Sequence, residues 1–461
     1  MRCNCPMWSN GWPNDNSESS TSGAFVLFSY LLMNKTASIE LINRHSFLTI
    51  FLGLFFLAFT TTESEAQDNP FELEPYPFVN QGLNQLVIPD SSLAYQQLFN
   101  KFTEVGLKGS GKVRIVHIGD SHLQADFFSG HFRKRLQTFF LGAMGGRGFI
   151  FPYKVAGTNN PLNYSVSSTG VWESCRNVEK ERNCELGLSG ISIKTLDTNA
   201  SIQIKITDQA LAGYDFDRLM VFHTFGTENF ALKIKPSNKI KLVQAFPEMG
   251  YTLFEFNQNL ESVTMELQKQ NETQKEFTLY GLNFDSNDPG IIYHTVGVNG
   301  AQYESYLKCD YFVPHLKVLN PDWIIVSLGT NDSYTNVFDT TVFIKKVDSL
   351  LQYIKQAAPN AAVLLTTPGD HRIKRVQVNA AAVRASEIIK KQAEQKQLAY
   401  WDFYSLMGGA GSMDAWRAVG LAHTDYLHFT QKGYEYQAQL LFVAFLKAYD
   451  DYMLRELQLK P

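Results

Sequence analysis

The period of the hydrophobic pattern changes twice along this 461-residue chain, and this change limits the possible architecture more than any other feature. Residues 93–141 and 291–449 alternate short, buried-looking strands with amphipathic helices. Between them, from Phe151 to Gly290, apolar residues recur at every second position, as in Ile202-Gln-Ile204-Lys-Ile206. Strand–helix units are typical of parallel sheets, and period-two alternation is typical of half-buried antiparallel strands. We therefore predict an α/β domain that is interrupted by an inserted β-sandwich domain at 151–290.

The α/β domain is predicted in two parts, residues 67–150 and 291–461. Its expected strands are 113–118, 291–296, 323–328, 362–367 and 400–403, and its expected helices are 93–105, 126–141, 303–319, 342–356, 373–394 and 431–449. Right-handed crossovers would place the five strands in one parallel sheet with helices on both faces. Ligands of such sheets bind beyond the carboxyl ends of the strands, so we expect a functional site there.

Residues 1–66 are excluded from the predicted fold because they contain a signal-peptide pattern. A basic flank precedes the nearly unbroken apolar run Phe47–Phe59, and small residues stand three and one positions before a cleavage site ahead of Gln67. The run is shorter than the ~20 residues that a spanning helix needs, which favours cleavage over an uncleaved membrane anchor. We expect an over-long segment before the leader, with Met33 as the start, and export to the periplasm or the extracellular space, with no stable membrane span after processing.

Charge and cysteine content narrow the possible partners. The formal net charge is −4 with acidic and basic residues interspersed, so the chain lacks a field that would attract a polyanion, and no nucleic acid is expected as a partner. Cys175 and Cys184 lie close together in a polar stretch and could form a disulfide in an oxidising compartment or remain two thiols. No cysteine stands in a metal-ligand pattern such as a CxxC pair.

Ser121 is the first candidate at a strand end, in the stretch Gly119-Asp120-Ser121-His122 after the first strand. A serine on a strand-to-helix turn exposes its hydroxyl, and its own N–H lies near a helix N-terminus, where negative charge is stabilised. These residues also suit an ordinary turn and helix cap, so the motif alone does not predict catalysis.

Two further polar turns follow later strands. Gly300, in Gly297-Val-Asn299-Gly300-Ala301, would let the backbone approach a substrate closely. Asn331, in Gly329-Thr-Asn331-Asp332, could aim its side-chain amide at a developing oxyanion. A simple turn at Gly300 and a helix cap at Asn331 are the alternatives.

The fourth segment, Asp425-Tyr-Leu-His428-Phe-Thr430, stands immediately before the last predicted helix. A serine needs a base to take its proton, and histidine, with an unperturbed pKa near ~6.5, suits that task at neutral pH. An aspartate three residues earlier can hold the imidazole in one tautomer. His423 is the second-ranked base. His117, His122 and His131 are expected to be structural.

In this order, these segments resemble the sequence blocks of the SGNH, or GDSL-type, hydrolases. Ser121, Gly300, Asn331 and His428 supply the four signature residue types, although GDSH replaces the commoner GDSL in the first block. Segments such as Met407-Gly408-Gly409 resemble the corresponding sequences of the branch of this family that contains bacterial peptidoglycan O-acetylesterases. In that branch a β-rich domain resembling a carbohydrate-binding module interrupts the hydrolase between its first and second blocks, where residues 151–290 lie here.

The resemblance implies a flavodoxin-like, three-layer hydrolase domain with an acyl-enzyme mechanism. Ser121 would attack an acetyl carbonyl while His428 takes its proton and Asp425 steadies the imidazolium. The N–H groups of Ser121 and Gly300 and the amide of Asn331 would form the oxyanion hole. The expected substrate is an acetylated cell-wall glycan, most of all peptidoglycan, and neither a metal nor an organic cofactor is implied. Asp120 would order its turn, as would the aspartate that follows Asn331.

Two other functions stay open from sequence. One is a polysaccharide O-acetyltransferase of the same fold, and the other is a glycan-binding protein that keeps the scaffold without catalysis. Four aromatic residues of the insert could stack on sugar rings, but core packing is the favoured interpretation; they are Tyr164, Trp172, Tyr214 and Tyr251. The oligomeric state has no signal in the sequence.

Overall fold

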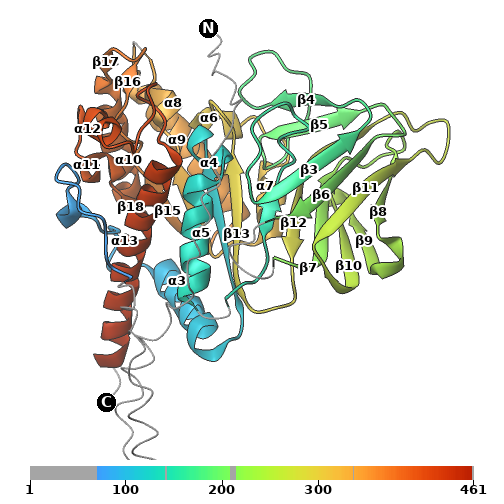
Figure 1. Ribbon diagram of the computed structural model, residues 1–461, viewed down its shortest axis with the longest axis horizontal. Coiled ribbons are helices and arrows are strands. Elements are labelled where there is room, and N and C mark those ends of the chain that lie inside the picture. Colours follow the sequence, from blue (N-terminus) through green and yellow to red (C-terminus); the bar gives the residue numbers. More distant parts are fainter. Residues whose placement is uncertain (1–69, 141–142, 208–213, 336, 459–461) are drawn as a thin grey trace, which may run out of the picture. The chain divides into compact units, whose positions relative to one another are not determined.

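The structure is a computed structural model that describes residues 70–140, 143–207, 214–335 and 337–458 (Figure 1). The expected signal peptide and the start at Met33 lie outside the described residues. Within the described ranges, no helix combines the length and the apolarity that crossing a membrane requires.

Five strands form a parallel sheet in the order β13-β1-β14-β15-β18. They are β1 (Lys112–Gly119), β13 (Gly290–Gly297), β14 (Trp323–Ser327), β15 (Ala362–Thr366) and β18 (Ala399–Trp401). In chain order the sheet reads 2-1-3-4-5, the flavodoxin-like arrangement, whose topological switch point lies between the first and third strands. Here that point lies between β1 and β14. The prediction of one parallel sheet is confirmed.

Helices cover both faces of this sheet, because successive strand residues point to opposite sides. Ile115 belongs to one buried cluster and Val116 to another. The first cluster includes residues of α3 (Leu93–Thr103), α5 (Phe127–Phe139) and α13 (Gln431–Gln458), and the second includes residues of α7 (Phe312–Leu319), α9 (Thr340–Ala357) and α10 (Ala380–Gln395). The predicted three-layer α/β architecture is confirmed.

Two predicted helices are wrong in part. The span 303–319 divides into α6 (Tyr303–Tyr306) and α7. In one continuous helix the ring of Pro314 would clash with the carbonyl four residues before it, whereas in α7 it stands in the first turn, where proline is tolerated. The span 373–394 begins with a two-stranded ribbon, β16 (Arg372–Ile373) and β17 (Gln377–Val378). The helix α10 starts only after Asn379, whose side chain accepts a hydrogen bond from the Ala381 N–H at 3.0 Å.

Antiparallel sheets fill the stretch between α5 and β13, as predicted. One sheet has the order β4-β5-β12-β7-β10-β9, with β2 paired to β12, and the other has the order β3-β6-β11-β8 (Figure 1). The strands are β2 (Gly148–Ile150), β3 (Tyr164–Thr169), β4 (Glu173–Arg176), β5 (Ile191–Thr195), β6 (Ser201–Ile206), β7 (Phe216–His223), β8 (Ala231–Lys235), β9 (Ile240–Phe246), β10 (Tyr251–Leu260), β11 (Ser262–Gln268) and β12 (Phe277–Asp285). The first of them, β2, precedes the boundary predicted at residue 151.

The aromatic residues considered for sugar stacking belong mainly to the interior of the insert. Tyr164 and Tyr214 are buried. Tyr251 stacks on another ring of the insert, and Trp172 is half-buried, donating its Nε1–H to the Thr169 carbonyl at 3.0 Å. Core packing is therefore the better account of Tyr164 and Tyr214.

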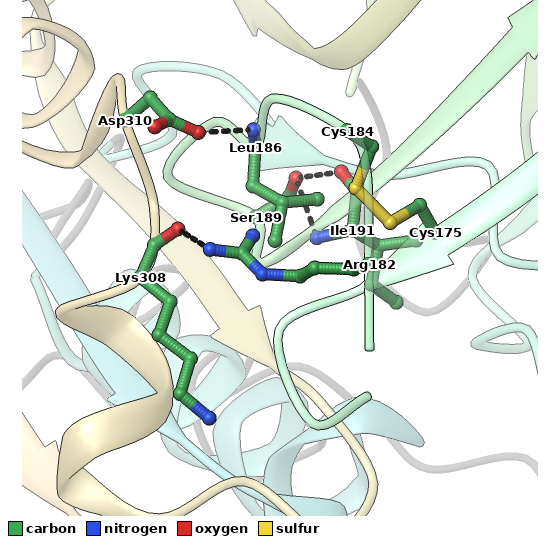
Figure 2. Close-up of a disulfide and its surroundings, with 8 residues drawn as sticks. All are labelled: Cys175, Arg182, Cys184, Leu186, Ser189, Ile191, Lys308 and Asp310. Carbon is green, nitrogen blue, oxygen red and sulfur yellow. Dashed lines mark hydrogen bonds between the residues drawn. A yellow bond between two sulfur atoms is a disulfide. The ribbon is translucent and has the colours of Figure 1, made fainter. Parts of the chain in front are cut away.

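A disulfide joins Cys175 and Cys184 in the insert (Figure 2). The loop that it closes lies against the segment between α6 and α7, where Arg182 donates a hydrogen bond to the Lys308 carbonyl. Just beyond the bridge, the Leu186 N–H donates to the Asp310 carboxylate at 3.0 Å. The bridged loop thus binds the insert to the hydrolase chain that follows Gly300.

A buried charge cluster centred on Asp126 makes a second connection. Its carboxylate accepts hydrogen bonds from Arg133 at 3.0 Å, Arg147 at 2.8 Å, Asn163 at 2.6 Å and Thr295 at 3.1 Å. Burial opposes ionisation of Asp126, but the two guanidinium groups outweigh it and hold its pKa below the ordinary value. These residues belong to α5, the start of the insert and β13, so the cluster fixes the insert against the parallel sheet.

Candidate active site

Ser121, His428 and Asp425 form one chain of hydrogen bonds at the carboxyl edge of the parallel sheet. Ser121 Oγ lies 2.9 Å from His428 Nε2, and His428 Nδ1 lies 2.7 Å from Asp425 Oδ2. Ser121 is half-buried, and the side chains of His428 and Asp425 are 21% and 32% exposed. The structure therefore brings together the three side chains that the sequence singled out and leaves them within reach of a substrate.

The turn after β1 holds Ser121 in place. Helix α4 (Ser121–Gln124) begins directly after Asp120, whose Oδ1 accepts the His122 N–H at 3.0 Å. A side chain at Gly119 would collide, because its Cβ would lie 2.8 Å from the Ser327 carbonyl oxygen. The Tyr306 hydroxyl donates to the Gly119 carbonyl at 2.5 Å. These contacts fix the hydroxyl of Ser121 at the switch point between β1 and β14.

The loop before α13 fixes the imidazole. Asp425 Oδ1 accepts the N–H groups of Leu427 and His428, both at 3.0 Å. Burial opposes ionisation of Asp425, but the bond from the His428 ring and these N–H groups hold the pKa of Asp425 below its ordinary value. An ionised Asp425 accepts a hydrogen bond from the Nδ1–H of His428, which leaves Nε2 free to accept a hydrogen bond from the Ser121 hydroxyl. His428, and not His423, is the ring that faces Ser121.

Two further histidines lie near His428, of which His122 is half-buried and His371 is buried. The His122 ring lies 5.3 Å from the His428 ring, centroid to centroid, and its Nδ1 lies 3.0 Å from the Tyr434 hydroxyl. Burial and the charge of His428 lower the pKa of His122 to about 3, and burial lowers that of His371 to about 4. Both rings are therefore neutral at neutral pH. No pattern in the sequence pointed to His371.

His117, which was expected to be structural, lies in β1 and faces the core. Its buried ring lies between the Tyr293 hydroxyl, at 2.6 Å, and Ser327 Oγ, at 2.7 Å. Burial lowers the pKa of His117 to about 3, so the ring is neutral. It joins three neighbouring strands beneath the site.

The residues expected to form the oxyanion hole differ in their availability. Gly300 has a φ of +86°, which favours glycine, and its N–H donates to none of the residues that the structure describes. Asn331 Nδ2 donates to Asp120 Oδ2 at 3.1 Å and to the Ala301 carbonyl at 3.0 Å. An amide nitrogen carries two hydrogens, so both are engaged. Asn331 can donate to an oxyanion only by releasing or sharing one of these bonds.

Asp120 and Asp332 order the surrounding turns. Burial raises the pKa of each carboxyl to about 7. Asp120 caps α4 and holds Asn331, and Asp332 Oδ2 accepts the Tyr303 N–H at 3.3 Å. Both contacts agree with the structural role expected from sequence.

The insert reaches this site through Gln124, a residue that the sequence did not single out. Its Nε2 donates to Thr158 Oγ1 at 2.9 Å and to Asn159 Oδ1 at 2.7 Å. Its Oε1 accepts the Asn299 N–H at 2.8 Å, next to Gly300. One amide therefore joins α4, the insert and the Gly300 turn.

The arrangement provides a hydroxyl that can act as a nucleophile, an imidazole that can act as a base, and a carboxylate that orients the imidazole. These are the groups that acyl transfer requires. In the part of the chain that the structure describes, no cluster of three or more histidine, cysteine, aspartate or glutamate side chains could hold a metal ion.

Residues 278–436 match the model of the GDSL-like Lipase/Acylhydrolase family. This segment of the chain belongs to the GDSL/SGNH hydrolase family. The matched segment contains Gly300, Asn331 and His428, whereas Ser121 stands before the insert and outside the match. The family predicted from the sequence is confirmed.

One solved structure is similar in fold to most of this chain, and others match about a third of it. A peptidoglycan O-acetylesterase is similar to this GDSL/SGNH hydrolase with a TM-score of 0.65 and 22% identity, over 81% of this chain and 98% of its own. A lipase/acylhydrolase from Enterococcus faecalis matches 34% of this chain and 77% of its own, at 20% identity and a TM-score of 0.28. A catalytic mutant of an acetylxylan esterase from Geobacillus stearothermophilus matches 35% and 74%, at 16% identity and a TM-score of 0.28. No curated protein sequence matches this chain.

Proposed function

We propose that this GDSL/SGNH hydrolase is an exported serine esterase that removes O-acetyl groups from a cell-wall glycan, peptidoglycan above all. The observation that carries the proposal is the continuous chain from Ser121 Oγ through the His428 ring to Asp425 Oδ2, with bonds of 2.9 Å and 2.7 Å. Family membership supports acyl chemistry at this site.

In the first half-reaction Ser121 Oγ attacks the acetyl carbonyl while its proton passes to His428 Nε2. Asp425 stabilises the imidazolium that forms. The carbonyl oxygen becomes negative and is stabilised by the N–H groups of Ser121 and Gly300 and by the Asn331 amide. The sugar oxygen leaves with the proton from Nε2, and the acetyl group stays on Ser121.

In the second half-reaction water attacks the acetyl-enzyme. His428 Nε2 takes a proton from the water, and the same donors stabilise the second oxyanion. Collapse of the intermediate releases acetate and returns the proton to Ser121 Oγ. Since His122 and His371 stay neutral, the positive charge of each step belongs to His428 alone.

Three observations support a glycan outside the cytoplasm as the substrate. The fold, including the inserted sheets, is similar to that of a peptidoglycan O-acetylesterase. The leader pattern before Gln67 favours export. The Cys175–Cys184 bridge suits an oxidising compartment.

The decisive test compares wild type with Ser121→Ala on an aryl acetate and on several acetylated polysaccharides side by side, quantifying released acetate. We expect Ser121-dependent hydrolysis of the aryl ester and the largest acetate release from O-acetylated peptidoglycan. Larger release from another polymer would overturn the substrate assignment.

The same incubations separate the rival functions. A transferase would produce acetylated acceptor sugar in place of free acetate. A protein without Ser121-dependent turnover on any ester would be a binding protein.

A further inference from the structure

A short hairpin connects the two catalytic loops. It comprises residues 372–378, with β16 and β17, and is called the rim hairpin below. On one side the Arg372 N–H donates to the Tyr426 carbonyl at 2.9 Å, one residue after Asp425. On the other side the Lys374 N–H donates to the Tyr334 hydroxyl at 2.9 Å. Tyr334 follows α8 (Thr330–Ser333), the turn that holds Asn331, so the rim hairpin is hydrogen-bonded next to both Asp425 and α8.

Buried hydrogen bonds hold the base of the rim hairpin. Asn379 Nδ2 donates to His371 Nε2 at 2.7 Å and to the Ser333 carbonyl at 2.8 Å. The Asn379 N–H donates to the His371 carbonyl at 3.0 Å. His371 and Asn379 are both buried. The rim hairpin is therefore fixed at its base relative to Asn331.

Its tip carries two exposed basic residues in an unusual conformation. Lys374 has a φ of +51° and Arg375 a φ of +66°, and the Val376 N–H closes the turn on the Ile373 carbonyl at 3.1 Å. Tight hairpin turns with positive φ at both central positions favour asparagine and glycine. Lysine and arginine rarely adopt this backbone conformation. Their presence at both central positions therefore points to a role for their side chains.

Basic residues gather on the rim hairpin and on the neighbouring helix α12. Arg372 pairs with Asp414 at 2.9 Å and 2.5 Å and lies over the Tyr426 ring at 5.4 Å, and Arg417 of α12 (Ser412–Ala418) lies over the same ring at 5.0 Å. The other acidic groups nearby are Asp425, bonded to His428, and Asp370, whose carboxylate accepts the Met413 N–H.

No described residue forms an ion pair with Lys374 or Arg375. These two exposed cations belong to a chain whose formal net charge is −4. A cationic rim beside a nucleophile attracts anionic substrates and repels cationic ones.

We propose that the rim hairpin binds a carboxylate of the glycan beside the acetylated sugar, so that the enzyme selects acid-bearing acetylated glycans over neutral ones. Lysine and arginine pair with carboxylates through charge-assisted hydrogen bonds. Lactyl and peptide groups of peptidoglycan and uronic acids of other polysaccharides share this chemistry. The inference rests on the proposed esterase function and specifies its substrate class.

The variant that tests this inference is Lys374→Asn combined with Arg375→Gly. It removes both charges and places favoured residues in the turn, so the hairpin should keep its shape. The matched control is Lys355→Ala with Lys391→Ala, which removes two exposed charges from α9 and α10. Each protein is assayed on acetylated muropeptides, on the same muropeptides with their carboxylates amidated, on acetylated oligogalacturonides and on neutral acetylated xylo-oligosaccharides.

We expect kcat/KM of the hairpin variant to fall about tenfold on the substrates that carry carboxylates, and to stay unchanged on the neutral oligosaccharide and on aryl acetate. For the wild-type enzyme, kcat/KM on the amidated muropeptides should be lower by the same factor than kcat/KM on the muropeptides with free carboxylates. A loss on muropeptides alone or on galacturonides alone identifies the source of the carboxylate. Equal rates of variant and wild type on every acidic substrate, or an equal loss on aryl acetate, would overturn the inference.

A binding measurement separates this inference from the esterase proposal. In Ser121→Ala protein, the affinity for acidic and amidated fragments is measured by calorimetry with and without the two hairpin substitutions. A preference for acidic fragments that disappears with Lys374 and Arg375 supports the inference even if no ester is hydrolysed. Equal affinities for acidic and amidated fragments contradict it, whatever the aryl acetate assay shows.

Discussion

Asn331 donates a side-chain hydrogen bond to Asp120 Oδ2 at 3.1 Å, so the residue next to the nucleophile holds the amide that is expected to stabilise the oxyanion. The other amide hydrogen is bound to the Ala301 carbonyl at 3.0 Å. Asp120 therefore acts on Asn331 as a positioning residue. One hydrogen bond therefore joins the sequence block that contains Ser121 to the block that contains Asn331.

Replacing Asn331 with alanine should lower kcat on an aryl acetate by about 10²–10³-fold, because one oxyanion donor is lost. Asp120→Ala should lower kcat less, with KM little changed, since the amide is still present but no longer held in orientation. The double variant should resemble Asn331→Ala alone. Additive losses would contradict the idea that Asp120 acts through Asn331.

The buried Asp120 carboxyl predicts a pH-dependent stability difference. Its pKa is raised from 3.8 to about 7, so between these values the folded state binds more protons than the unfolded state. The free energy of unfolding contributed by this group therefore falls as the pH rises through that range, by at most about 1.4 kcal/mol per pH unit. Asp120→Asn, which does not titrate, should be more stable relative to wild type at pH 8 than at pH 5. Denaturant unfolding at both pH values checks the sign.

The hydrogen-bonded chain at the nucleophile predicts strongly non-additive kinetics. Asp425→Asn should lower kcat by about 10⁴-fold, because an amide can hold the ring in the wrong tautomer. Ser121→Ala should abolish acyl-enzyme formation, and adding His428→Ala or Asp425→Asn to it should cause little further loss. His423→Ala is the matched control and should leave kcat near wild type. A large loss in His423→Ala with an active His428→Ala would reverse the assignment of the base.

The buried cluster around Asp126 predicts a large effect on stability. Asp126→Asn removes the buried carboxylate that pairs with both Arg133 and Arg147, which should lower the free energy of unfolding by about 3–5 kcal/mol. Since the pKa of Asp126 is held below its ordinary value of 3.8, this difference is present above that pH and should shrink as the pH falls below it. Asp90→Asn, an exposed aspartate, is the control and should have little effect.

The disulfide should contribute to stability and little to chemistry. Closing the short loop between Cys175 and Cys184 restricts the unfolded chain by about 2–3 kcal/mol. Cys175→Ser with Cys184→Ser should therefore lower the Tm while the aryl acetate rate at 25 °C is kept. Because the bridged loop contacts the segment after Gly300, a large loss of kcat at that temperature would show that the loop also orders the oxyanion turn.

The sequence predicted the parallel sheet, the inserted sheets and the segments that meet at Ser121. These predictions succeeded because buried strands such as Val113–Ile118 and alternating strands such as Ile202–Ile206 have different hydrophobic periods. Polar residues at the ends of parallel strands converge on one edge of the sheet, so the order of the strands alone places Ser121 and Asn331 close together.

Other features could not be predicted because they depend on tertiary contacts. Ile373 and Val376 fit a helical spacing as well as a hairpin, so their pattern does not distinguish the rim hairpin from a first helical turn. Three such features join residues that are far apart in the chain. They are the two hydrogen bonds donated by the Asn331 amide, the packing of His371 near His428, and the contacts of Gln124 with the insert and the Gly300 turn. No local pattern encodes such pairs.

The insert separates two strands that are hydrogen-bonded neighbours, since β1 pairs with β13 from Lys112–Gly290 to Gly119–Gly297. Their alignment must wait until residues 120–289 have collapsed enough to bring the two ends together. Folding of the insert is thus coupled to completion of the catalytic edge, and a protein synthesised without a folded insert would have its nucleophile on a strand that lacks one partner. Ser121 therefore follows a strand whose partner β13 is synthesised only after the whole insert.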